Sequence, residues 1–345
     1  MQKIKNPIGR LIIHITLWVF ILYNSVPFFW TFLQSLKTKK QANSRTPLFW
    51  FEPTLEHYSE LWLESVPENF VLLVCFIIAI LLALFLFSII GKHLSVSAFV
   101  IRFIILGSII IILFSIPFFV ETAEFYDYFV NTMIVGAGTV IISISMASLS
   151  GYALSRYLGI AGVVLIILAL AFRSLPRMAF GLPYFWMGQI SGLFDSNFLV
   201  IVALAAVNQP FAIYMLRSFF KDIPREIEEA AMVDGASRFE AFIRVIVPIM
   251  WPGIIATSLF TLVLVYHEFL LVRILTLKNW TVAVAMQQYL GGISDSGSLP
   301  LKSAAAVSAA LPLLVIILFY QKHLIKGITT GSCLLYTSTS PRDRG

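Results

Sequence analysis

Charged side chains are scarce in this sequence of 345 residues: Asp, Glu, Lys and Arg together make up 12%, whereas 59% of the residues are hydrophobic. Soluble globular chains are about one quarter charged. A chain so poor in charge is expected to have lipid as its solvent over most of its surface. Its formal charge of +6 comes from Lys and Arg scattered between apolar runs, so the sequence does not predict a nucleic-acid partner.

The sequence also has few cysteines and lacks a complete phosphate-binding loop. Of the two cysteines, Cys75 lies inside an apolar run and Cys333 lies in the C-terminal tail, so neither a disulfide framework nor a thiolate metal site can be assembled. The pair Gly91-Lys92 is followed by His93 rather than Ser or Thr, which leaves no cradle for nucleotide phosphates. The chain is therefore not expected to hydrolyse ATP itself; that reaction would need another polypeptide.

One dipeptide resembles the start of a zinc-protease motif. The motif H-E-x-x-H places two metal ligands one helical turn apart. Here His267-Glu268 is followed by Leu271 where the second histidine would stand. We therefore expect no catalytic residue, no metal site and no cofactor bound by this chain, and we predict that it is not an enzyme.

Long apolar runs are what the sequence has in abundance. A helix that crosses the hydrocarbon core needs roughly 20 mostly apolar residues, and patterns typical of barrel strands are absent. The sequence predicts an all-α integral membrane protein, a polytopic helical bundle of about eight transmembrane helices. We place them at about 11–35, 69–91, 97–120, 130–151, 159–186, 197–220, 250–272 and 303–320.

Loop charges predict the orientation of these spans. Positive loops tend to stay in the cytoplasm. Lys3 and Lys5 precede the first span, and Lys322 and Lys326 follow the last. An even number of spans with both termini in the cytoplasm satisfies most of the chain. The basic segment 37–45 disagrees, because it follows the first span on the side that we expect to be external.

The cytoplasmic loop 221–249 carries the signals of a first short helix. Asp222 can cap its N-terminus, and Pro224 suits the first turn, where a missing N–H costs nothing. Gly235 is expected to end this helix, because glycine tolerates the left-handed geometry of a C-terminal cap. Ala230 and its neighbour Ala231 leave a low-profile surface that another protein could approach.

A second helix is predicted directly after this glycine. Ser237 and Glu240 form an S-x-x-E capping box at its start, and Pro248 is expected to stop it. Loops between membrane spans rarely need a helix, a sharp turn and another helix. We therefore interpret the loop as a docking element for a partner protein.

The residues of this loop resemble a known family. Glu229-Ala230-Ala231, then Asp234-Gly235, then Val247-Pro248 are similar to the EAA motif of binding-protein-dependent importer permeases, the MetI-like subunits of ATP-binding-cassette importers. The similarity covers most of 128–331. The type is similar to carbohydrate-uptake permeases such as the smaller membrane subunit of the maltose transporter.

This resemblance implies a function and a set of partners. The chain would be a permease subunit in a bacterial-type inner membrane, translocating a sugar or oligosaccharide that an extracytoplasmic solute-binding protein delivers. Its other partners would be a second homologous permease subunit, membrane lipid and two copies of a cytoplasmic ATPase that uses ATP and Mg. The residues expected to couple the chain to that ATPase are Glu228, Glu229, Ala230, Ala231, Asp234, Gly235 and Pro248.

The same resemblance divides the chain into three parts. Residues 128–331 are expected to form the permease core, with the EAA coupling loop at 221–249. Residues 1–127 are expected to form an N-terminal transmembrane region with two helices beyond the usual six spans of this type. The tail 332–345 does not resemble a family terminus, and we interpret it as non-native.

Several polar residues lie in the predicted spans, where ionisable groups are costly. The candidates for the solute path share a depth from the middle to the outer half of three spans: Arg173, Arg177, Asn208, Gln209, His267 and Glu268. Together they suggest a cavity for an acidic or heavily hydroxylated solute. The alternatives are that the two amides only bridge helices, and that either arginine pairs with Glu268 or extends toward the interface.

Three other functions remain open at this level. An ion-gradient-driven secondary transporter would also show many spans and a few buried charges, although the docking loop argues against it. A membrane enzyme would need the catalytic residues that are missing. A signalling subunit built on the same fold would keep the loop, and solute flux in reconstituted vesicles would separate it from a permease.

Overall fold

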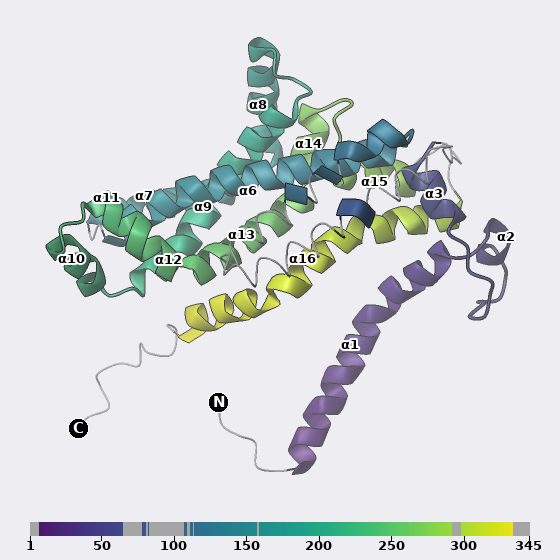
Figure 1. Ribbon diagram of the computed structural model, residues 1–345, viewed down its shortest axis with the longest axis horizontal. Helices are drawn as coiled ribbons and strands as arrows, with labels where there is room; N and C mark the ends of the chain where they lie inside the picture. The colour runs from purple at the N-terminus through teal and green to yellow at the C-terminus, as the bar shows by residue number, and fades with distance from the viewer. Residues whose placement is uncertain are drawn as a thin grey trace. The chain divides into compact units, whose positions relative to one another are not determined.

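The computed structural model describes residues 7–64, 78–80, 82, 107–108, 111–112, 114–156, 159–291 and 298–333. Helices dominate these residues, and an isolated antiparallel bridge joins Leu63 to Thr122 (Figure 1). The chain divides into two compact units. The first contains residues 1–130 and 286–310, and the second contains residues 131–285 and 311–345.

The first unit begins with α1 (Pro7–Ser35), followed by α2 (Lys39–Ala42) and α3 (Glu56–Trp62). Along α1, large apolar side chains such as Trp18 and Phe20 are more than 60% exposed. A helix this apolar has no reason to face water, so lipid or another membrane chain must cover it.

Among the described residues, helices long enough to cross a membrane lie at four of the eight predicted spans. Four helices are long and apolar enough to cross a membrane: Leu11–Ser35, Glu124–Arg156, Asn197–Lys221 and Leu299–Gln321. A fifth candidate is a bent pair, Arg238–Ile249 with Trp251–Tyr266, whose two parts meet at 75°. The predicted run 69–91 and most of 97–120 lie outside the described residues, as does most of the tail 332–345.

The predicted single span 159–186 is wrong. The chain forms two helices there, α7 (Ile160–Arg173) and α8 (Met178–Ser191). Pro176 lies in the break. Proline cannot donate a backbone hydrogen bond, and its ring disfavours helical geometry in the residue before it, so the first helix ends ahead of it.

Helix α9 (Asn197–Lys221) organises the second unit. Its N-terminal half, around Leu204, packs in one hydrophobic core with Leu271 and Leu275 of α14 (Leu270–Leu275). Its C-terminal half, around Leu216, packs in a second core with Phe242 and Ile246. At 1.5 Å rise per residue α9 is roughly 37 Å long, so it connects two separate sites.

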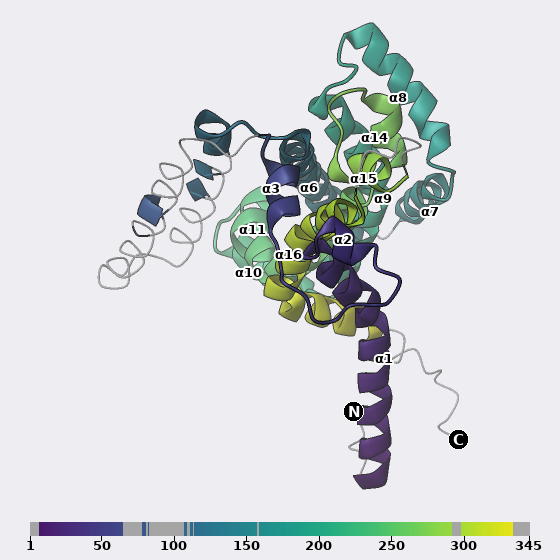
Figure 2. The same cartoon turned by 90° about the vertical axis from the view of Figure 1, so that its right-hand side faces the viewer.

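The remaining helices complete the described chain. α6 (Glu124–Arg156) precedes α7, and α13 (Trp251–Tyr266), α15 (Val282–Gly291) and α16 (Leu299–Cys333) follow the loop 221–249. The predicted span 250–272 is interrupted at 267–269, between α13 and α14. Figure 2 shows α8 beside α14, two helices that are in contact.

Candidate functional site

The first short helix of the loop is α10 (Arg225–Val233). Its N-terminal cap is Pro224, so the prediction that Asp222 caps it is wrong. Asp222 instead ends α9, and its backbone N–H donates to the carbonyl of Phe219 at 3.2 Å. The reason is that α9 runs to Lys221, which leaves only Ile223 and Pro224 to turn the chain.

The predicted turn at Gly235 is confirmed. Gly235 has φ +91°, and the N–H of Ala236 donates to the carbonyl of Ala231 at 3.0 Å. An added β-carbon on Gly235 would meet nothing within 4 Å. The need for glycine is therefore conformational, because side chains with a β-carbon rarely adopt this φ.

The predicted capping box is also confirmed, but the predicted stop is wrong. Ser237 Oγ accepts from the N–H of Glu240 at 3.3 Å, and Glu240 Oε2 accepts from the N–H of Ser237 at 3.0 Å. α11 (Arg238–Ala241) then continues through a π-helical turn, Phe242–Ile246, into α12 (Val247–Ile249). Pro248 occupies the first turn of α12, where its missing N–H is tolerated.

Most of the predicted coupling residues face outward. Glu229, Ala230, Asp234, Gly235 and Pro248 are exposed, and Ala231 is half-buried. Two large apolar neighbours are exposed as well, namely Val233 at 87% and Phe239 at 62%. We call Glu229, Ala230, Val233, Asp234 and Phe239 the docking face. An exposed apolar surface of this kind is typical of a protein interface.

Glu228 differs from the other predicted coupling residues because it is buried. Its Oε2 accepts a hydrogen bond from Arg156 Nε at 3.0 Å, and its Oε1 accepts one from the hydroxyl of Tyr152. Both partners belong to the last turns of α6. Neither Tyr152 nor Arg156 was among the residues predicted from the sequence to act with this loop. The sequence did contain one signal for this burial. Glu228 and Glu229 are adjacent in a predicted helix, and adjacent residues on a helix face different directions, so the two carboxylates could not both face the same partner.

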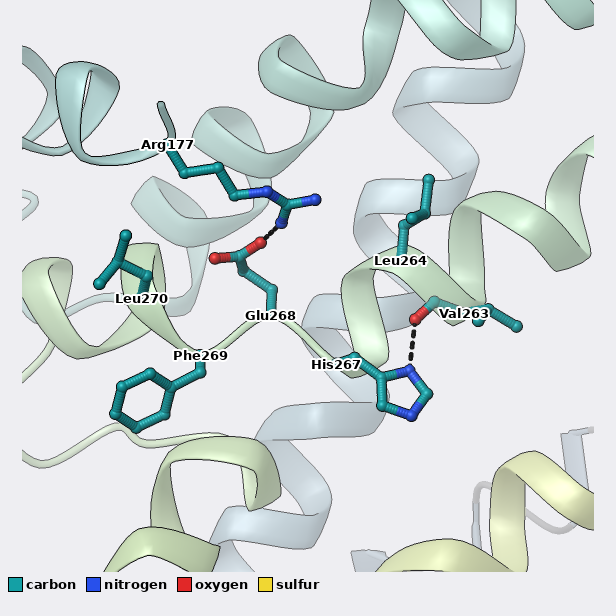
Figure 3. A pocket seen from close by; sticks show the side chains of 7 residues that line it. All are labelled: Arg177, Val263, Leu264, His267, Glu268, Phe269 and Leu270. Carbon is teal, nitrogen blue, oxygen red and sulfur yellow. Dashed lines mark hydrogen bonds and ion pairs between the residues drawn. The ribbon is translucent and has the colours of Figure 1, made fainter. Parts of the chain in front are cut away.

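A second site lies where α13 is interrupted. An open hollow of about 380 Å³ is lined by Arg177, Val263, Leu264, His267, Glu268, Phe269 and Leu270. Figure 3 shows that the guanidinium of Arg177 points toward the carboxylate of Glu268, with which it forms an ion pair. The Glu268 side chain is 2% exposed, whereas that of Arg177 is 39% exposed. The pair therefore joins the break after α7 to the break after α13.

Hydrogen bonds hold two side chains of this hollow in place. Glu268 Oε1 accepts from the N–H of Leu271 at 3.2 Å, which ties this carboxylate to the first turn of α14. His267 Nδ1 lies 2.8 Å from the carbonyl oxygen of Val263, one turn earlier on α13, as Figure 3 also shows. Its exposed ring leaves Nε2 available to a hydroxyl group.

The structure does not bring all six predicted path residues together. Arg177, His267 and Glu268 line the hollow, but Asn208 and Gln209 are not among the residues that line it. Asn208 Nδ2 donates to the carbonyl of Leu204 within α9 at 2.9 Å. Gln209 Nε2 donates to the carbonyl of Ser143 on α6 at 3.3 Å, so this amide bridges two helices. The side chain of Arg173, the last residue of α7, lies outside the described residues.

Asp195, in the turn between α8 and α9, is a further polar residue with a well-defined role. It has φ +61°, and its Oδ1 accepts from the N–H groups of Leu277, Lys278 and Asn279 at 2.9–3.1 Å. Burial alone would raise the pKa of Asp195, but the backbone bonds from Asn279, Leu277 and Lys278 outweigh it and hold the pKa below its ordinary value. Asp195 therefore fixes the loop after α14.

Residues 101–330 match the family model described as the binding-protein-dependent transport system inner membrane component. The chain is 29% identical over 210 residues to the trehalose transport system permease protein of Mycobacterium tuberculosis, covering 60% of this chain and 77% of the relative. It is 25% identical over 209 residues to the maltodextrin transport system permease protein of Bacillus subtilis, covering 60% of this chain and 75% of the relative.

A solved structure shares the fold. It is a chain of the crystal structure of a bacterial ABC transporter involved in the import of the acidic polysaccharide alginate. The TM-score is 0.64 at 16% sequence identity, over 93% of this chain and 98% of that chain. At this identity the likeness shows the fold alone.

Proposed function

This chain belongs to the family of binding-protein-dependent transport system inner membrane components, and we propose that it is the permease subunit of an importer for a carbohydrate. Relatives named for trehalose and maltodextrin support a sugar or oligosaccharide as solute. The hollow beside Arg177 offers an ion pair and a histidine ring nitrogen, groups that bind hydroxyls well.

The observation that carries this proposal is the docking face, most of which lies on or directly after α10. A nine-residue helix that presents Glu229, Ala230 and the 87% exposed Val233 suits a groove on another protein. We propose that the protein with this groove is a cytoplasmic ATPase, which is present in two copies and uses ATP with Mg. This chain would supply no catalytic residue to the hydrolysis.

The remaining partners follow from the same proposal. A second homologous permease subunit would complete the solute path, and an extracytoplasmic binding protein would deliver the solute. The chain is a multi-pass membrane protein, and we propose that it lies in a bacterial-type cell membrane with both termini in the cytoplasm.

The proposed mechanism is alternating access. Closure of the ATPases would push the docking faces of the two permease subunits together, and the attached helices would turn the solute cavity outward. α9 is suited to this role because its two hydrophobic cores connect the docking loop to the helix that follows Glu268. Release of the hydrolysis products would reverse the change.

Reconstitution tests the proposal. The chain, its co-purified partner subunits and the binding protein are placed in vesicles, and uptake of labelled maltodextrin or trehalose is measured with and without ATP. Uptake that requires ATP supports the importer. Uptake that instead follows a proton or sodium gradient and persists without ATP would support a secondary transporter and contradict this proposal.

A further inference from the structure

The buried carboxylate of Glu228 is in the wrong place to contact an ATPase. Its side chain is 11% exposed and faces α6, whereas the docking face lies on the other side of α10. A buried charge is costly unless it is paired and hydrogen-bonded. The contacts of Glu228 therefore indicate what this position does.

Four hydrogen bonds connect the end of α6 to the segment 223–228. Arg156 Nε donates to Glu228 Oε2 at 3.0 Å, and Arg156 Nη1 donates to the carbonyl of Ile223 at 3.1 Å. Arg225 Nη2 donates to the carbonyl of Arg156 at 2.8 Å, and the Tyr152 hydroxyl donates to Glu228 Oε1. Arg156 thus holds both the start of α10 and its inward face.

Aromatic packing surrounds this hydrogen-bonded cluster. The ring of Tyr152 lies 4.7 Å from that of Phe242, at the start of the π-helical turn, and 5.7 Å from that of Phe220, near the end of α9. The guanidinium of Arg156 lies 5.6 Å from the Tyr152 ring. The low-dielectric surroundings strengthen each polar contact in the cluster.

The end of α6 is also fixed to α9. Arg217 Nε on α9 donates to the carbonyl of Leu154 at 3.2 Å, and a β-carbon on Gly151 would stand 3.1 Å from the backbone nitrogen of Arg217. A displacement of α10 that reaches Arg156 therefore has to move α6 together with α9. The other connection between α10 and the end of α9 is the short turn 222–224, in which Ile223 is buried in the second hydrophobic core.

We propose that Arg156 and Glu228 form a clamp that carries movement of α10 into α6, which makes them positioning residues of the transport cycle. The inference rests on the proposed function, because the movement originates in the partner ATPase. Glu228 acts inside the permease, while Glu229 and its exposed neighbours act at the docking face.

The clamp predicts a change in coupling rather than in assembly. In the reconstituted complex, Glu228→Gln is expected to lower solute uptake per ATP hydrolysed about tenfold, because it removes the charge that pairs with Arg156 and weakens two of the four hydrogen bonds between α6 and the segment 223–228. The ATPase should still co-purify, since the docking face is intact. The control is Arg244→Ala, which breaks an exposed ion pair with Glu240 at 3.8 Å in the same loop without touching α6, and which should keep the wild-type ratio.

A double variant keeps the test valid if a single variant folds poorly. With Cys75 and Cys333 replaced by Ser, Arg156→Cys combined with Glu228→Cys removes the ion pair, and a short thiol-specific cross-linker then rejoins α6 to α10. The clamp predicts low uptake per ATP before cross-linking and a return toward the wild-type ratio afterwards. The readout is uptake per ATP hydrolysed by the assembled complex, so a variant that only reduced the amount of folded protein would leave this ratio unchanged before and after cross-linking.

The outcomes separate this inference from the proposed function. If the wild-type complex takes up no solute on addition of ATP, the proposed function fails. If the wild-type complex transports but Glu228→Gln keeps its uptake per ATP, or the cross-link restores nothing, the clamp is refuted and the importer stands.

Discussion

The backbone nitrogen of Arg217 lies 3.1 Å from the point where a β-carbon on Gly151 would stand, so α6 and α9 touch through their main chains. The same virtual β-carbon would also lie 3.3 Å from Leu216 Cβ and 3.4 Å from the carbonyl oxygen of Ile213. All three atoms belong to α9, and two of them are backbone atoms that cannot rotate away, so there is little room for a side chain at position 151.

Gly151→Val is therefore expected to force α6 away from α9 and to lower the free energy of unfolding by about 1–3 kcal/mol. Thermal unfolding of the purified protein in detergent measures this. Ser145→Val is the matched control, because Ser145 is exposed on the same helix and should tolerate the change. Equal stability of the two variants would contradict the close contact.

Gly235→Val is expected to abolish ATP-driven uptake, because a branched side chain at φ +91° strains the turn that positions the docking face. Gly235→Asn should retain part of the uptake, since asparagine adopts left-handed geometry at lower cost. Uptake assays of both variants in reconstituted vesicles give the comparison. Wild-type uptake by the valine variant would show that the turn has no part in coupling.

Arg177→Leu leaves the carboxylate of Glu268, which is 2% exposed, without its partner. We expect this variant to be less stable and to lose most of its solute uptake. The double variant with Glu268→Gln should recover the stability, because no buried charge then remains unpaired. Arg273→Leu serves as the control, because it removes an arginine of α14 that lies over the Trp280 ring and is not among the residues that line the hollow. Unchanged uptake of every sugar and sugar acid by Arg177→Leu would exclude a role for this pair in the solute path.

The lowered pKa of Asp195 predicts that the stability of the fold depends on pH. Its pKa is lower in the folded protein than in the unfolded chain, so the carboxylate stabilises the fold at pH values above its ordinary pKa. That contribution is lost as the pH falls through the lowered pKa. At neutral pH, Asp195→Asn should cost about 1 kcal/mol, because three backbone N–H groups lose a charged acceptor. Melting curves should show the two proteins converging in acid; a constant difference would contradict this explanation.

The parts of the site that the sequence predicted correctly are those determined locally. The turn at Gly235 and the capping box of Ser237 with Glu240 follow from the backbone preferences of a few consecutive residues. The ends of the longest apolar helices, such as Asn197–Lys221, were also close to the prediction. Hydrophobic length alone accounts for them.

The parts that the sequence did not reveal depend on packing. Pro176 could have kinked a single span or divided it, and only the surrounding helices decide between the two. Glu228 could have faced the ATPase, but Arg156, which lies 72 residues earlier in the chain, holds it inside. Pro248 was expected to stop a helix, and a π-helical turn before it lets the chain continue.

The measurement that tests the central claim most directly is a cross-link from the docking face to the partner ATPase. Ala230→Cys, in a chain with Cys75 and Cys333 replaced by Ser, is treated with a short cross-linker in membranes that contain the assembled complex. Leu182→Cys is the control, because Leu182 is 74% exposed on α8, a helix that lies apart from α10 and α11 in Figure 1. We predict that the variant at Ala230 cross-links to a nucleotide-hydrolysing subunit and the variant at Leu182 does not. Accessibility of position 230 only to an extracellular or lipid-soluble reagent, with no ATPase captured, would contradict the account.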